Sequence, residues 1–192
     1  MATLIDQICT KASLETRRLQ FRVQRTPSVL DVERLAQQLN ERPNVLFLCT
    51  GNICRSPFAE RYLRDALRNR SEERMLVDSA GIRTHQGRSS PEQAVSVGTE
   101  FGVDLSDHRS KPVTEAQLEW SDIVFVMDLH NDHYLRRKFG RQPGTYFLGA
   151  LTPDDAVEIA DPYGGGESTF RSLYSEIVSA IDEGLALVVE DG

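Results

Sequence analysis

Residues 44–57 read NVLFLCTGNICRSP, a short apolar run followed by a polar loop and a proline. The apolar run ends at Cys49 and is typical of a strand that is buried on both faces of a sheet. Ser56 is a favoured N-cap residue and Pro57 is favoured in the first turn of a helix, so a helix is predicted to begin here. This stretch therefore predicts a strand, a tight loop and a helix in succession.

The chain after residue 57 repeats this alternation of strand and helix. Apolar runs predict three further strands, and apolar stripes at helical spacing predict the helices between and after them. Strands that alternate with helices form right-handed βαβ units, which give an α/β fold whose parallel sheet is covered on both faces. In such a sheet, ligands bind at the carboxyl ends of the strands. The predicted strands are 44–49, 75–79, 122–127 and 145–149, and the predicted helices are 57–68, 91–101, 129–139 and 166–189.

Residues 1–42 differ from the rest of the chain, because they are polar, rich in arginine and interrupted by proline. They contain two apolar patterns with helical spacing, and Ser28 or Asp31 could cap the second helix. We therefore predict an N-terminal extension, 1–42, of helices that are docked or partly disordered, followed by a domain of residues 43–192. The apolar residues are Leu4, Ile5, Ile8 and Ala12 in the first pattern and Leu30, Val32, Leu35 and Leu39 in the second.

The composition excludes several classes of protein. The chain has 192 residues, 40% of them hydrophobic, and a net charge of −7, which does not favour nucleic acid or an anionic membrane as a partner. No apolar run reaches the ~18 residues of a membrane span, and the first residues lack the pattern of a signal peptide. The three cysteines indicate free thiols in a reducing compartment. We therefore expect a cytoplasmic protein.

The loop after the first strand has the composition of a phosphate-binding site. Gly51 and Asn52 tolerate left-handed backbone angles, so that successive N–H groups can point at one centre beside a helix N-terminus. Arg55 can hold two oxygens of a phosphate with its planar guanidinium. The same field stabilises Cys49 as a thiolate nucleophile, and Ser56 can donate its hydroxyl to the sulfur. The loop therefore predicts a thiol that reacts with phosphate groups.

Residues 49–60, CTGNICRSPFAE, resemble the signature of the low-molecular-weight protein tyrosine phosphatases almost residue for residue. The resemblance extends over about residues 44–190, because four further segments resemble family motifs in the same order. It implies a flavodoxin-like three-layer sandwich with a four-stranded parallel sheet, to which the N-terminal helical extension is added. The four segments are DSAG at 78–81, DLSDHR at 104–109, SDIVFVMD at 121–128 and DPYGG at 161–165.

The resemblance implies a role for each residue that matches a family motif. Cys49 would be the nucleophile that carries a phosphocysteine, Arg55 would hold the phosphoryl oxygens, and Asp161 would protonate the leaving oxygen. His85 and Tyr163 would contact the substrate at the entrance of the cleft. The loop residues that would bind the substrate are Thr50, Gly51, Asn52, Ile53, Cys54 and Ser56.

The resemblance also implies a support for the loop and a redox partner for the nucleophile. Asn52, Ser79 and His108 would form a hydrogen-bonded support behind the loop. Cys54 would form a reversible disulfide with Cys49 and so protect it from overoxidation. The implied reaction uses no metal ion and no cofactor.

One segment departs from the family pattern. Ile82 and His85 stand where many relatives have threonine and tryptophan, so that His85 or Tyr163 would have to stack on the substrate ring. Arg83 and Arg88 favour acidic residues around a phosphotyrosine.

Three alternatives stay open. An arsenate reductase of the thioredoxin-coupled kind needs cysteines after Cys54, so only a version that relies on a small external thiol fits. A phosphoarginine phosphatase typically has threonine in the place of Ile53, whereas isoleucine is the choice of the tyrosine phosphatases. A non-catalytic phosphotyrosine-binding module would have lost Cys49 or Asp161.

The expected partner is a tyrosine-phosphorylated protein. By resemblance to bacterial relatives, a tyrosine kinase of polysaccharide export is the default substrate, whereas nucleic acid and membrane are not expected as partners. The sequence does not specify an oligomeric state.

Overall fold

The computed structural model describes residues 29–70, 75–142, 144–152 and 157–188. Within these residues, four parallel strands form one sheet in the order β2-β1-β3-β4. The strands are β1 (Val45–Cys49), β2 (Val77–Gly81), β3 (Ile123–Val126) and β4 (Thr145–Phe147). The predicted α/β fold with a four-stranded parallel sheet is confirmed.

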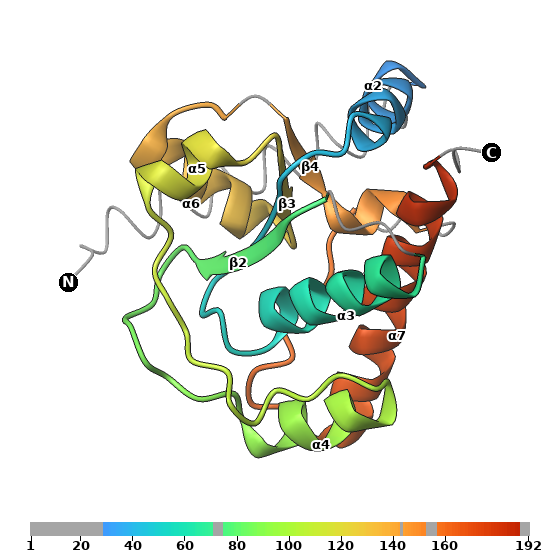
Figure 1. The fold of residues 1–192 in the computed structure, drawn as a ribbon. Coiled ribbons are helices and arrows are strands. Elements are labelled where there is room, and N and C mark those ends of the chain that lie inside the picture. The colour runs from blue at the N-terminus through green and yellow to red at the C-terminus, as the bar shows by residue number, and fades with distance from the viewer. Residues whose placement is uncertain (1–28, 71–74, 143, 153–156, 189–192) are drawn as a thin grey trace.

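Helices cover both faces of the sheet and give the fold three layers (Figure 1). On one face lie α3 (Arg55–Asn69), α4 (Glu92–Glu100) and α7 (Glu167–Ala186). On the other face lie α5 (Glu115–Trp120) and α6 (Leu129–Phe139). The carboxyl ends of β1, β2 and β3 therefore meet at one edge of the sheet, where the loops to the next helices begin.

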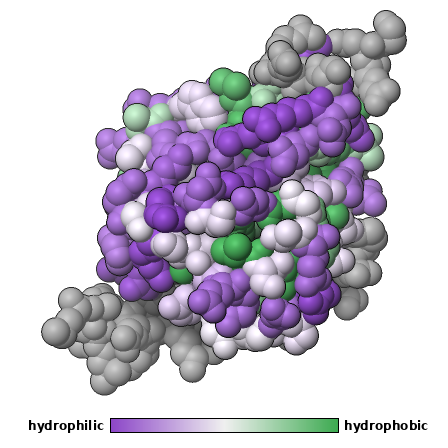
Figure 2. Space-filling model, turned by 60° about the horizontal axis from the view of Figure 1, so that its bottom comes forward, coloured by the Kyte–Doolittle hydropathy of each residue, from purple (hydrophilic) through white to green (hydrophobic). Residues whose placement is uncertain are grey.

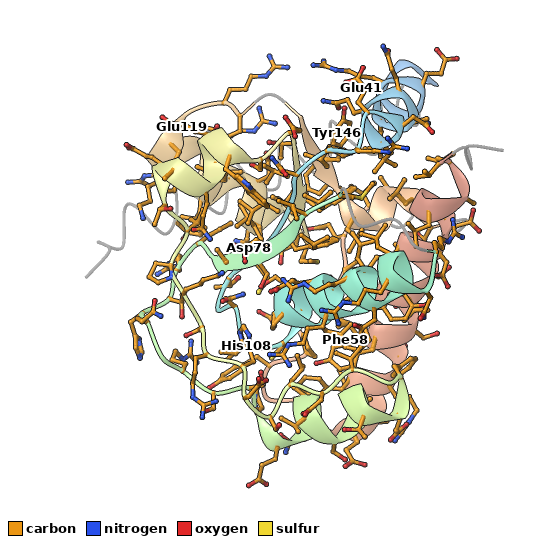
Figure 3. The ribbon with its side chains drawn as sticks, in the orientation of Figure 1. Glu41, Phe58, Asp78, His108, Glu119 and Tyr146 are labelled. Atoms are coloured by element: carbon orange, nitrogen blue, oxygen red, sulfur yellow. The ribbon has the colours of Figure 1, made fainter. Side chains whose placement is uncertain are left out.

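The two faces of β1 belong to two separate cores. Side chains alternate along a strand, so Phe47 and Cys49 pack with α3, α4 and α7, whereas Leu46 and Leu48 pack with α5 and α6. In the first core, the ring of Phe58 on α3 stacks on Tyr174 of α7 with 3.7 Å between the ring centroids (Figure 3). This packing holds the N-terminal half of α3 against α7.

Several element boundaries differ from the prediction. Helix α3 begins at Arg55 rather than at Pro57, its N-cap is Cys54, and that cap makes no side-chain hydrogen bond. The prediction that Ser56 caps the helix is therefore wrong, because its hydroxyl is engaged by the thiol of Cys49 instead. Strand β2 lies two residues later than predicted, and β4 ends at Phe147, where a 3-10 helix η1 (Leu148–Leu151) follows.

Helix α5 was missing from the prediction. Thr114 and Gln117 form a capping box at its start, in which Thr114 Oγ1 accepts the Gln117 N–H at 3.2 Å and Gln117 Oε1 accepts the Thr114 N–H at 3.1 Å. A Thr-x-x-Gln pattern is a recognisable signal of a helix start. The helix is only six residues long, so its apolar stripe is too short to stand out.

The second helical pattern of the N-terminal extension is confirmed as α2 (Val29–Asn40). Leu35 and Leu39 are buried in the first core, and the hydroxyl of Tyr146 on β4 donates to Gln38 Oε1 at 2.6 Å (Figure 3). Asp31 lies inside the helix and so does not cap it. The first pattern, at residues 4–12, lies outside the described residues, and the division between 1–42 and 43–192 stays a prediction.

Leu39→Ala is expected to lower the free energy of unfolding by about 2–4 kcal/mol, because it removes a buried side chain and leaves a cavity. Urea denaturation measures this loss. Gln37→Ala on the exposed side of the same helix is the control and should change the stability by less than about 0.5 kcal/mol. Equal stability of the two variants would contradict the docking of α2.

Hydrophilic side chains cover most of the face shown in Figure 2, with hydrophobic ones gathered in a small patch near its centre. In the described part of the chain, no helix has both the length and the apolar character that crossing a membrane would require.

Candidate active site

The loop between β1 and α3 wraps around the thiol of Cys49. Asn52 adopts a left-handed backbone angle, with φ of 50°, and this turn directs its N–H to Cys49 Sγ at 3.2 Å. Ser56 Oγ lies 3.0 Å from the same sulfur. Cys49 is 2% exposed, so the sulfur is buried beneath the loop, where it faces a backbone N–H and a hydroxyl. Such donors, beside the N-terminus of a helix, favour an anion bound next to the sulfur.

Asn52 is held by hydrogen bonds on three sides. Its Nδ2 donates to Ser56 Oγ at 3.0 Å and to Ser79 Oγ at 2.9 Å, and its Oδ1 accepts the N–H of Lys111 at 2.9 Å. Its carbonyl oxygen lies 2.7 Å from Nε2 of His108. The structure therefore brings Asn52, Ser79 and His108 together as a hydrogen-bonded group, next to the start of α3 (Figure 3).

A buried carboxylate that the sequence analysis did not single out extends this group. Glu60 on α3 accepts the hydroxyl of Ser79 at 2.5 Å and the guanidinium of Arg64 at 2.6 Å. A hydrogen-bond chain thus runs from Glu60 through Ser79 and Asn52 to the hydroxyl that contacts the thiol. Glu60 belongs to the quoted signature, so the spacing of the motif was the available signal.

Burial shifts the pKa of His108 and of Cys54, two groups that lie around the loop. Burial lowers the pKa of His108, against the opposing effects of the Asn52 carbonyl and Glu60, so the neutral ring can donate from Nε2 to Asn52 O. Burial, followed by the charges of Cys49 and Asp161, raises the pKa of Cys54 far above its usual range. Cys54 is therefore a neutral thiol, and Cys49 and Cys54 are both free cysteines.

Arg55 lies at the first position of α3 with only 1% of its surface exposed. Its Nη1 donates to Asp128 Oδ2 at 2.7 Å and to the carbonyl of Ile159 at 2.9 Å, and its Nη2 lies 2.9 Å from Asp161 Oδ2. Burial acts to lower the pKa of Arg55, but Cys49, Asp128 and Asp161 together raise it above the ordinary value. The guanidinium is thus held rigidly, and no described residue provides a partner for its buried Nε.

Asp128 is a second site residue that the sequence analysis missed. It lies two residues after the end of β3 and caps α6, where its Oδ1 accepts the N–H of Asn131 at 2.7 Å. Asn131 in turn donates from Nδ2 to Thr50 Oγ1 at 3.1 Å. The position of Asp128 at the carboxyl end of a parallel strand was the signal that could have identified it.

Asp161 follows Cys49 by 112 residues in the sequence, and the fold places it over the arginine of the loop. Its side chain is 46% exposed, so it stands at the mouth of the site rather than at its base. Asp161 Oδ1 accepts the N–H of Tyr163 at 3.3 Å, and Gly164 follows with φ of 86°. Such a glycine-containing loop can move when a ligand enters.

The remaining predicted substrate contacts lie at different depths. Thr50 and Gly51 are partly exposed, whereas Ile53 and Cys54 are buried in the ligand-free loop. Tyr163 is 64% exposed, and His85 is exposed, with its carbonyl accepting the hydroxyl of Ser110 at 2.8 Å. In the described part of the chain, neither ring stacks on another aromatic ring, so both can lie along a bound substrate.

Asn52→Ala is expected to lower the free energy of unfolding by about 1–3 kcal/mol and to weaken the binding of inorganic phosphate at least about tenfold. The substitution removes the amide that joins the loop to Ser79 and places alanine, which tolerates a positive φ less well than asparagine, at φ of 50°. Urea denaturation and calorimetric phosphate titration measure the two effects.

Asn52→Gly serves as the control, since glycine adopts the positive φ without strain. It should recover about 1 kcal/mol of the stability but not the phosphate affinity. Full recovery of both would show that only the backbone angle matters.

The described residues contain no group of three or more His, Cys, Asp or Glu side chains that could hold a metal ion. The site instead combines a thiol, a backbone N–H and a hydroxyl beside it, a buried guanidinium and a half-exposed carboxylate. A tetrahedral dianion would fit the N–H donors and Arg55, with the thiol behind its central atom and Asp161 in front of it.

Comparisons with known proteins agree with this arrangement. A family model described as "Low molecular weight phosphotyrosine protein phosphatase" matches residues 44–191. The chain is 31% identical over 150 residues to the protein of that name from Sus scrofa, covering 75% of this chain and 93% of the relative. It is 35% identical over 138 residues to the probable low molecular weight protein-tyrosine-phosphatase AmsI of Erwinia amylovora, covering 71% and 91%.

A third relative is named for a different activity. The chain is 31% identical over 139 residues to a protein-arginine-phosphatase of Geobacillus stearothermophilus, covering 72% of this chain and 90% of the relative. Among solved structures, the crystal structure of the Erwinia amylovora tyrosine phosphatase AmsI matches with a TM-score of 0.68 and 30% identity, covering 77% of this chain and 93% of that one.

Proposed function

Because the chain belongs to the low molecular weight phosphotyrosine protein phosphatase family, we propose that it hydrolyses phosphotyrosine in proteins with Cys49 as nucleophile, Arg55 as phosphate clamp and Asp161 as general acid. Enzymes of this family are hydrolases that act through a phosphocysteine, and the chain is a cysteine-dependent phosphatase of this kind. The assignment of roles rests on one contact. Arg55 Nη2 lies 2.9 Å from Asp161 Oδ2, beside the loop that surrounds the Cys49 thiol.

In the first step, the phosphate group enters the loop between β1 and α3 and replaces Asp161 as a partner of Arg55. The Cys49 sulfur attacks the phosphorus, so that an S–P bond forms while the bond to the phenol oxygen breaks. Asp161 gives its proton to that oxygen and becomes a carboxylate, while the phenol leaves. Arg55 stabilises the charge that develops on the equatorial oxygens.

In the second step, water attacks the phosphocysteine. Asp161, now a carboxylate, takes the proton from this water as the S–P bond breaks and inorganic phosphate forms. The departing thiolate receives hydrogen bonds from the Asn52 N–H and the Ser56 hydroxyl, whose distances to the sulfur are 3.2 and 3.0 Å. These donors make the sulfur a good leaving group.

Ile53 supports phosphotyrosine over phosphoarginine as the substrate. A branched apolar side chain beside the phosphate loop can pack on a flat aromatic ring, whereas a hydroxyl would suit the polar guanidine group. A substituent on Gly51 would lie 3.4 Å from Ile53 Cγ1, so this side chain adjoins the loop where the group attached to the phosphate must pass.

Ile53→Thr is expected to lower kcat/KM for a phosphotyrosine peptide relative to a phosphoarginine peptide by about tenfold, since the apolar contact with the ring is lost. Release of phosphate from the two peptides measures the ratio. Ile53→Val is the matched control, because it keeps a branched apolar surface. A phosphoarginine preference in the unaltered protein would overturn the assignment.

A tyrosine-phosphorylated protein is the proposed partner, and a cytoplasmic tyrosine kinase of polysaccharide export is the proposed substrate. The resemblance to bacterial members of the family supports both. Loss of phosphotyrosine from such a kinase on incubation with the phosphatase, but not with its Cys49→Ser variant, tests this proposal. A kinase that keeps its phosphotyrosine would contradict it.

Hydrolysis of p-nitrophenyl phosphate in the presence of EDTA, across pH 4–8, tests the class of reaction. Activity that survives EDTA and is lost on alkylation of Cys49 supports the proposal. Arsenate-dependent consumption of a small thiol without hydrolysis would instead favour the reductase alternative, and binding of phosphate with neither activity would favour a binding module.

The reversible disulfide between Cys49 and Cys54 stays a prediction. Peroxide would oxidise Cys49 to a sulfenic acid, and the thiol of Cys54 would displace water from it to form the disulfide. Mass spectrometry after mild peroxide treatment should find the Cys49–Cys54 bond. A stable sulfonic acid at Cys49 would contradict the protective role.

A further inference from the structure

The segment that follows β2 runs along the outer edge of the phosphate loop. The N–H of Ile82 donates to the carbonyl of Cys49 at 3.0 Å, and the N–H of Arg83 donates to the carbonyl of Thr50 at 3.0 Å. These bonds bring the backbone of Arg83 to the loop itself. A side chain that starts here can reach the residues that flank a bound phosphotyrosine.

The side chain of Arg83 is held in place by α6. Its Nη1 donates to the hydroxyl of Tyr134 at 3.1 Å, and its Cζ lies 4.7 Å from the centroid of the Tyr134 ring. Tyr134 lies one helical turn after Asn131, which is itself bound to Thr50. Arg83 therefore bridges the segment after β2 and α6 across the edge of the site, with its guanidinium stacked on a ring.

A second arginine of the same segment lies on the loop. A substituent on Gly51 would lie 3.4 Å from Arg88 Nη1, so this guanidinium rests against the backbone that surrounds the phosphate. The carbonyl of Arg88 accepts the N–H of Ser110 at 2.9 Å, and this bond secures its backbone.

Neither arginine is neutralised by the part of the chain that the structure describes. Arg55 is paired with Asp128 and Asp161, whereas no described carboxylate forms an ion pair with Arg83 or Arg88. A chain with a net charge of −7 thus keeps two unpaired guanidinium groups beside the loop. Carboxylates are the ligands that such planar, preorganised groups bind best.

On the basis of the proposed function, we propose that Arg83, positioned by Tyr134, and Arg88 form a subsite for acidic side chains that flank the phosphotyrosine of a protein substrate. Tyr134 is a positioning residue, because it holds the guanidinium without touching the substrate. An exposed pair of this kind changes binding by a few-fold rather than by orders of magnitude, and it weakens with salt.

The test uses two phosphotyrosine peptides that are identical except for glutamate or glutamine on both sides of the phosphotyrosine. In 20 mM salt, we expect kcat/KM to be about tenfold higher for the glutamate peptide, and this preference to shrink in 500 mM salt. In Arg83→Ala, the ratio of the two kcat/KM values should fall about threefold, since Arg88 keeps part of the preference. Hydrolysis of p-nitrophenyl phosphate is measured in parallel, since it has no flanking residues.

Two further variants separate position from charge. Tyr134→Leu should lower the peptide ratio about as much as Arg83→Ala, and Tyr134→Phe, which keeps the ring, should restore most of it. Lys138→Ala is the matched control, because Lys138 Nζ also lies 4.7 Å from a ring centroid, that of Phe139, on α6. Lys138→Ala also removes one positive charge, and it should leave the ratio of kcat/KM for the two peptides unchanged.

The outcomes distinguish this proposal from the proposed function. Hydrolysis of both peptides at equal rates, or an equal fall for peptides and p-nitrophenyl phosphate in Arg83→Ala, would overturn the acidic subsite and leave the phosphatase assignment standing. Failure of the unaltered protein to hydrolyse any of the three compounds would overturn the phosphatase assignment and the subsite with it. A glutamate preference that Lys138→Ala lowers as much as Arg83→Ala would also overturn the subsite, because it would reflect the net charge alone.

Discussion

Cys49→Ser is expected to lower kcat for p-nitrophenyl phosphate by about 10⁴- to 10⁶-fold, the loss that follows removal of an enzyme's nucleophile. A serine hydroxyl is a far weaker nucleophile than a cysteine sulfur, so transfer of the phosphoryl group to residue 49 is very slow. The N–H groups of the loop and Arg55 are unchanged, and inorganic phosphate should therefore bind within about threefold of its original affinity. Single-turnover hydrolysis and calorimetric phosphate titration measure the two effects.

The control for this variant is Cys9→Ser, the same chemical change in the N-terminal extension, which should alter kcat by less than about twofold. Substantial residual turnover in Cys49→Ser would show that the phosphoryl group is transferred to another acceptor. Loss of phosphate binding together with turnover would indicate that the loop had collapsed, and urea denaturation of the variant would show this directly.

Asp161→Asn is expected to slow hydrolysis of phenyl phosphate by about 10²- to 10³-fold, and that of esters with better leaving groups progressively less. A phenol with a high pKa cannot leave without a proton, whereas p-nitrophenol leaves nearly as well without one. A plot of log kcat/KM against the pKa of the leaving phenol should therefore become steeper in the variant. Steady-state rates with a series of substituted phenyl phosphates provide this slope.

Asp128→Asn is the matched comparison, because Asp128 is the other carboxylate that contacts Arg55, at 2.7 Å. It holds the arginine from the side of β3 and α6 and is less exposed than Asp161, with side-chain exposures of 14% and 46%. Its loss should lower the rates for all leaving groups by a similar factor and leave the slope unchanged. A steeper slope in Asp128→Asn, with none in Asp161→Asn, would reverse the two roles.

The extent of the elements was predicted well where packing follows the local pattern. Helix α6 was predicted at 129–139 and is found at Leu129–Phe139, and the buried apolar runs of β1 and β3 are found within one residue of their predicted ends. The spacing of apolar residues can be read from neighbours in the sequence, so it predicts these elements without knowledge of the fold. Boundaries set by long-range contacts, such as the start of α3, were predicted less well.

Residues 49–57 by themselves determined the local chemistry of the site: a thiol at the end of a buried strand, a loop with Gly51 and Asn52, and an arginine at the start of a helix. The partners of that arginine were decided by the tertiary structure alone. Asp128 and Asp161 lie far along the chain. Asp128 meets Arg55 because parallel strands bring their carboxyl ends to one edge of the sheet, and Asp161 does so because the Ile159 N–H donates to the Met127 carbonyl after β3 at 2.8 Å.

The tertiary structure also decided the hydrogen-bonded group of Asn52, Ser79 and His108 behind the loop. Asn52 meets Ser79 because β1 and β2 pair in register, with Cys49 beside Gly81. The charge of Arg83 could be seen in the sequence, but its place on the Tyr134 ring could not, since 51 residues separate them. Sequence neighbours specify which groups are present, whereas the pairing of distant strands and helices decides which of them touch.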